Sequence, residues 1–138
     1  MAITLSELIL HVRAALADIT ADMVDDAQIY HDIKKADAYI RQLVPADTIT
    51  AQESYISSCI VNLAAYYTYV NYTSLAERQQ GTLPPTALIR INALREIALA
   101  FLTPVTPFKL NSDLSIDESQ LERTPAIAFG LIKSSLED

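Results

Sequence analysis

Few side chains in this chain could carry out catalysis or bind a metal ion, and their spacing fits neither purpose. His11 and His31 are the two histidines, and Cys59 is the single cysteine. None stands at the H-x-x-x-H, E-x-x-H or C-x-x-C spacing that places two ligands on one metal ion. Asp32 follows His31, but adjacent residues on a helix point in different directions. We therefore expect neither a structural zinc nor a carboxylate-bridged di-iron site.

The motifs of nucleophilic and phosphate chemistry are also missing. Gly81 and Gly130 stand alone, so the chain has no glycine-rich phosphate loop and no G-x-S-x-G elbow. Cys59 lies in an apolar run, as a core cysteine does. Three aspartates lack the glycine and the closing glutamate of a calcium loop: Asp22, Asp25 and Asp26. We expect no enzyme and no cofactor; a small enzyme that uses Tyr and Asn groups is the least favoured alternative.

Length and charge limit the remaining classes. The 138 residues suffice for one domain with its own core. Ten basic and seventeen acidic residues give a net charge of −7. Because nucleic acids are bound through clustered Lys and Arg, this balance argues against a protein that reads a DNA groove. The N-terminus lacks the basic segment and long apolar run of a signal peptide, so we expect an intracellular origin.

Hydrophobic periodicity predicts an all-α fold, a four-helix bundle over residues 1–103. The first helix begins at Thr4, in the capping box T-L-S-E, and the second follows an acidic entry and ends before Pro45. A second capping box, T-A-Q-E at residues 50–53, starts a long central third helix that runs to about Gln79. Gly81 is its expected terminator, and a fourth helix begins at the prolines 84–85.

The third helix has no charged residue from Ser54 to Ala76. Polar residues are spread through it and no basic cluster flanks it, so we expect a helix buried in protein, with no membrane span. A helix without a polar side must be surrounded, and neighbouring subunits are the simplest cover. Tyrosines suit such an interface, and we predict four there: Tyr55, Tyr66, Tyr69 and Tyr72. The alternative is that the C-terminal segment covers this face within one chain.

The fourth helix is apolar on two sides, which also favours a partner. One side carries Leu88, Ile91, Leu94, Ala98 and Phe101, and the other Ile89, Ala93, Ile97 and Ala100.

Residues 104–138 form a predicted extended C-terminal arm of different character. The segment has three prolines, a predicted short helix capped by Ser115 and Glu118, and then a strand-like alternation of apolar residues. An apolar end is unlike a solvated tail and needs a surface, either on its own bundle or on another chain. The predicted partner-binding residues are Ile127, Phe129, Leu131 and Ile132.

This layout resembles the head–tail connector, or adaptor, proteins of tailed bacteriophages. The resemblance covers the whole chain: a capped first helix, an acidic entry into DDAQIYHDIKKADAYIRQL, the uncharged SYISSCIVNLAAYYTYVNY, a fourth helix and an apolar arm. It rests on architecture, because the family has no short diagnostic motif.

The resemblance implies a structural virion protein at the head–tail junction, assembled in the host cytoplasm. Such subunits form a homo-oligomeric ring, commonly of twelve, under the portal protein. The ring extends the DNA channel and offers a docking platform to the next neck or tail protein. DNA would pass without specific binding, which suits an acidic protein. The alternative function is a cytoplasmic helical interaction or regulatory module, a small dimeric bundle that binds a partner peptide in an apolar groove.

Overall fold

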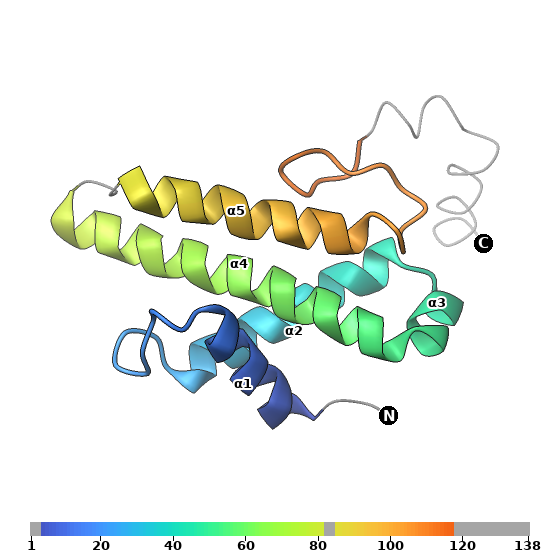
Figure 1. The fold of residues 1–138 in the computed structure, drawn as a ribbon, viewed down its shortest axis with the longest axis horizontal. Coiled ribbons are helices and arrows are strands. Elements are labelled where there is room, and N and C mark those ends of the chain that lie inside the picture. The colour runs from blue at the N-terminus through green and yellow to red at the C-terminus, as the bar shows by residue number, and fades with distance from the viewer. Residues whose placement is uncertain (1–3, 82–84, 118–138) are drawn as a thin grey trace, which may run out of the picture.

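The computed structural model of the chain describes residues 4–81 and 85–117 and has the predicted all-α fold (Figure 1). Within these ranges there are five helices and no strand, only an isolated bridge between Leu110 and Ile116. The helices are α1 (Leu5–Ala15), α2 (Asp26–Leu43), α3 (Ala46–Ala51), α4 (Glu53–Gln80) and α5 (Pro85–Leu102). The four longer helices are compatible with the predicted four-helix bundle.

The longest helix, α4, lies at the centre of the fold. It packs against α1, α2, α3 and α5. Figure 1 shows α5 along one side of α4 and α1 on the other, with α2 crossing behind α4. The core is formed by aliphatic residues of α2 and α4 such as Ile33, Ile40 and Leu63, closed by Val12 from α1 and Ala98 from α5. Among the described residues, no helix has both the length and the apolar character needed to cross a membrane.

Most helix ends follow the local signals in the sequence. The Thr4 hydroxyl accepts a hydrogen bond from the Glu7 amide at 3.2 Å, which confirms the first predicted cap. Gly81 ends α4 in the left-handed conformation, with φ of 82°. The second predicted capping box is wrong, because Thr50 lies inside the short helix α3 and α4 begins after Gln52 without a side-chain cap.

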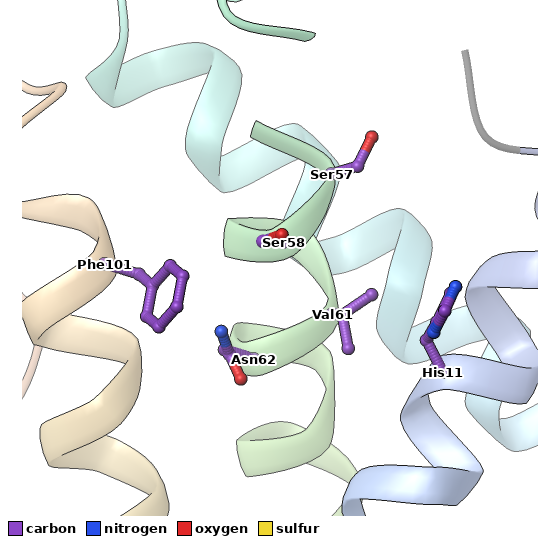
Figure 2. A pocket seen from close by; sticks show the side chains of 6 residues that line it. All are labelled: His11, Ser57, Ser58, Val61, Asn62 and Phe101. Carbon is purple, nitrogen blue, oxygen red and sulfur yellow. The ribbon is translucent and has the colours of Figure 1, made fainter. Parts of the chain in front are cut away.

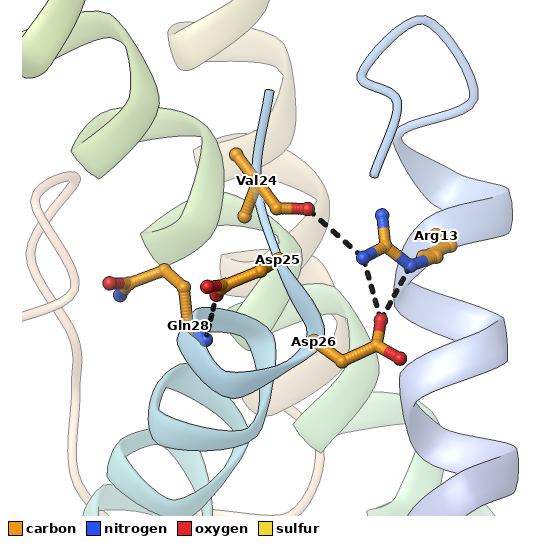
Figure 3. Close-up of polar contacts among 5 residues, drawn as sticks. All are labelled: Arg13, Val24, Asp25, Asp26 and Gln28. Carbon is orange, nitrogen blue, oxygen red and sulfur yellow. Dashed lines mark hydrogen bonds and ion pairs between the residues drawn. The ribbon is translucent and has the colours of Figure 1, made fainter. Parts of the chain in front are cut away.

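The junction between α1 and α2 is fixed by polar contacts (Figure 3). The Arg13 guanidinium donates to Oδ1 of Asp26 at 2.6 and 2.9 Å and to the Val24 carbonyl at 3.0 Å. Asp25 caps α2 by accepting from the Gln28 amide at 2.9 Å. The predicted helix-entry aspartates therefore have two roles, one as a cap and one as an ion-pair partner.

The described part of the predicted arm, residues 104–117, lies against the bundle. Val105 and Leu114 are buried, and Thr106 donates from its hydroxyl to the Leu43 carbonyl at 2.9 Å. Leu114 has a left-handed backbone, with φ of 73°, and its carbonyl accepts from the Tyr39 hydroxyl. Two apolar residues of this stretch, Val105 and Leu114, are thus buried by their own chain.

The helix predicted to begin at Ser115 is not formed in the described residues. The Ser115 carbonyl accepts from the Asn111 amide at 2.8 Å, and the Asp117 amide donates to the Lys109 carbonyl at 2.8 Å. Residues 115–117 therefore pair with residues 109–111 in an extended turn. Glu118 and the predicted partner-binding residues lie outside the described residues: Ile127, Phe129, Leu131 and Ile132.

Candidate interaction surfaces

The pocket that includes a histidine lies over α4, between α1 and α5 (Figure 2). His11 stands on the α1 side and Phe101 on the α5 side, with Ser58, Val61 and Asn62 of α4 between them. The pocket has a volume of about 290 Å³. The Ser58 hydroxyl donates to the backbone carbonyl of Ser54 in its own helix. With no carboxylate, lysine or arginine in its lining, the pocket offers His11 no charged partner for acid–base work.

Cys59 is a core residue in the structure. Its side chain is fully buried, and its thiol donates to the Phe101 carbonyl at 3.4 Å. Burial raises the pKa of this thiol to about 11, so it stays protonated at neutral pH and lacks the thiolate that a nucleophile needs. Within the described residues, no group of three His, Cys, Asp or Glu side chains is placed to hold a metal ion.

A buried aspartate joins α2 to α4. Asp32 is fully buried and accepts hydrogen bonds from the Thr68 hydroxyl at 2.6 Å and the Asn71 amide at 3.1 Å. The side-chain amide of Gln28 donates to both oxygens of the same carboxylate, at 3.2 and 3.3 Å. Sequence analysis missed this network, although Thr68 and Asn71 stand three residues apart on α4 and so share a face. The network fixes α2 against α4, since unpaired buried polar groups are costly.

All four tyrosines predicted at a subunit interface make ring contacts inside the chain, and Tyr66 and Tyr72 do so with the neighbouring tyrosines Tyr67 and Tyr69. Tyr55 stacks on Phe101 with ring centroids 5.6 Å apart and donates from its hydroxyl to the Phe101 carbonyl at 2.7 Å. Tyr69 is only 8% exposed, and the Arg90 guanidinium lies 5.2 Å from its ring. Tyr66 and Tyr72 are half-buried. The interface prediction therefore rests on the accessible parts of Tyr66 and Tyr72.

A neighbouring tyrosine, Tyr67, faces α2. The Lys35 ammonium lies 4.5 Å from its ring, a cation–π contact. Burial is the main cause that raises the pKa of Tyr67 to about 12. The tyrosines of α4 thus point to different helices of the same chain, and they do not form one aromatic platform.

The apolar surface left open by this packing lies on α5. Ile89 is 70% exposed and Ile97 is 45% exposed, and Ala93 and Ala100 are exposed with them. These four residues recur at intervals of four, four and three, so they share one side of the helix. The opposite side, which includes Ala87 and Ala98, packs toward the core. We call Ile89, Ala93, Ile97 and Ala100 the α5 stripe.

A second apolar surface lies across the molecule, where α1 meets α2. A groove of about 250 Å³ has Leu5 and Leu8 of α1 on one wall and Tyr30 of α2 on the other. Its floor is formed by the buried residues Ile33 and Ile60. Leu5 is 41% exposed and Tyr30 is 39% exposed. We call this the α1–α2 groove; sequence analysis did not predict it.

No protein-family model, no curated protein and no solved structure matches this chain.

Proposed function

We propose that this chain is a structural head-to-tail adaptor of a tailed bacteriophage, which assembles as a ring under the portal protein. The observation that carries the proposal is the α5 stripe, in which Ile89 and Ile97 remain exposed after the rest of the bundle has packed. Contiguous exposed apolar surface on a folded domain is typical of an interaction site. A bundle that leaves one apolar helix face open is a suitable subunit for a homo-oligomer.

Charge supports the second part of the proposal, the passage of DNA. The chain carries a net charge of −7, and three of its arginines are engaged in ion pairs: Arg13 with Asp26, Arg41 with Asp37 and Arg90 with Asp18. An acidic ring repels the phosphate backbone, so DNA slides through the channel without being held. The portal protein and the next neck or tail protein are the proposed partners, and the arm that includes Phe129 is the proposed contact with the portal or an adjacent subunit.

The experiment is to measure the assembly state of the full chain over a wide concentration range. Sedimentation velocity gives the mass of the species formed, and electron microscopy shows whether the large species are closed rings. A ring-sized species supports the adaptor. A protein that stays monomeric at every concentration, or that stops at a dimer, contradicts it.

The dimeric outcome would support the alternative, a small helical interaction module. The α5 stripe is compatible with it, because two copies could pair through this same surface about a two-fold axis. The two functions therefore differ in a measurable way: the module needs one self-complementary surface, whereas a ring needs two different surfaces on each subunit.

A further inference from the structure

We propose that the α5 stripe of one subunit seats in the α1–α2 groove of a second copy of this chain. The contact would be head-to-tail, between two different surfaces of identical subunits. This inference rests on the proposed ring and specifies which two surfaces build it.

The positions of the two surfaces favour this arrangement. The stripe lies on the side of α5 that faces away from the core, and the groove lies between α1 and α2. Figure 1 shows α1 and α5 on opposite sides of α4. A subunit therefore does not fill its own groove with its own stripe. Contacts between unlike surfaces on opposite sides repeat from subunit to subunit, and they close into a ring when the rotation permits.

The shapes of the two surfaces also fit one another, because one is a helix face and the other is a groove between two helices. Along the stripe, large and small side chains alternate, so Ala93 leaves a notch between Ile89 and Ile97. The groove has a hollow of about 250 Å³ between Leu5 and Tyr30. One helix laid in a groove between two others is a common packing solution for apolar helix faces.

Charged residues of opposite sign border the two surfaces, and the groove is also lined by Asp37, which already pairs with Arg41. Glu96 is exposed on α5 beside Ile97, and Lys34 borders the groove. Within the described residues, neither makes an ion pair; the Lys34 ammonium lies 5.4 Å from the Tyr30 ring. A head-to-tail contact would bring these two charges to one interface, where opposite signs favour the correct register.

Two-fold pairing of the α5 stripe with itself accounts for only one of the two exposed apolar surfaces. It would cover the α5 stripe of both copies but leave Leu5 and Tyr30 exposed. The head-to-tail contact covers both apolar surfaces with a single type of interface.

A complementation experiment tests the assignment. Ile97→Asp places a charge in the stripe, and Leu5→Asp places one in the groove. Each variant alone should need a concentration about 30-fold higher, or more, to assemble, because a buried carboxylate disrupts every contact. Mixed in equal amounts, the two should form a 1:1 heterodimer and stop there, since the intact stripe of one fits the intact groove of the other. Native mass spectrometry measures these species.

Folding is controlled by circular dichroism and thermal melting of each variant, since both positions are exposed. Ile89→Asp and Tyr30→Glu form a second pair if either first variant fails to fold. If the wild type assembles and Leu5→Asp assembles equally well, the groove assignment is overturned while the adaptor proposal stands. If the wild type never assembles, both are overturned.

Discussion

Helices α4 and α5 are both poor in charge, yet the chain covers one and leaves the other open. From Tyr55 to Val70 no residue of α4 is exposed, because α1, α2, α3 and α5 surround it. Among the helices that the structure describes, α4 is the main neighbour of α5, and the α5 stripe stays exposed. A missing polar face therefore does not identify the interaction surface. The number of neighbours a helix has in its own chain decides whether its apolar side is available.

The largest expected effect is a loss of stability, and it should differ between a buried residue of α4 and an exposed residue of α5. Leu63→Ala in α4 removes a fully buried side chain and should lower the free energy of unfolding by about 2–5 kcal/mol. Ile97→Ala on α5 removes a half-exposed side chain and should change the free energy of unfolding by about 0.5 kcal/mol. Urea denaturation of the dilute protein measures both. A loss for Ile97→Ala as large as that for Leu63→Ala would mean that the α5 stripe is part of the chain's own core.

Substitution of the buried Asp32 tests how much its hydrogen bonds contribute to holding α4 against α2. Asp32→Ala leaves the donors of Thr68 and Asn71 without their acceptor, so it should cost about 1–3 kcal/mol of unfolding free energy. Asp37→Ala, on the same helix, is the matched control. It removes an ion pair with Arg41 at 3.1 Å between largely solvated groups, worth about 0.3–0.5 kcal/mol. Equal losses in the two variants would show that the Asp32 network adds no more than a surface pair.

Several features of the fold could be predicted from local residue patterns. The Thr4 cap and the Gly81 terminator were predicted correctly, because each depends on residues within one helical turn. The absence of charge between Ser54 and Ala76 correctly indicated that most of this helix is enclosed, but Asn71, Ser74 and Leu75 are exposed, and the cover found is the chain's own helices where neighbouring subunits were expected. The two apolar sides of α5 were also visible from spacing alone, and the exposed one is the α5 stripe.

The rest depends on which helices become neighbours in three dimensions. The short helix α3 replaced a predicted cap at Thr50, because the chain turns twice between α2 and α4. The Asp32 network joins residues 36 and 39 positions apart. Spacing could show that α4 must be covered, but it could not show that the cover for Tyr55 and Tyr69 comes from α5.

A smaller effect is expected from the tyrosine hydroxyls that join the two helices. Tyr55→Phe keeps the ring stacked on Phe101 but removes the hydrogen bond to its carbonyl, so it should cost about 0.5–1.5 kcal/mol. Tyr66→Phe is the control, because its hydroxyl has no hydrogen-bond partner among the described residues. Thermal melts of the monomer compare them. If Tyr66→Phe weakens assembly while Tyr55→Phe does not, the predicted interface role belongs to Tyr66.

The smallest expected effect concerns the charges beside the two apolar surfaces. Glu96→Lys and Lys34→Glu should each weaken assembly by about 0.2–1 kcal/mol per contact, because each places like charges at the proposed head-to-tail interface. An equimolar mixture of the two variants should recover wild-type assembly. In an alternating order, Lys at position 96 meets Glu at position 34, and the next contact is the wild-type pair.

This reciprocal rescue separates the two ways in which α5 could find a partner. If α5 paired with α5 about a two-fold axis, Lys34→Glu would assemble like the wild type. It would then rescue the assembly of Glu96→Lys no better than the wild-type protein does. Lys109→Glu, at an exposed position outside the α1–α2 groove, controls for the change in net charge. Because surface charges are screened by salt, the loss and the rescue should both shrink as ionic strength rises. Sedimentation at low and high salt therefore reports whether Glu96 and Lys34 meet across the interface, independently of the apolar contacts that provide most of its affinity.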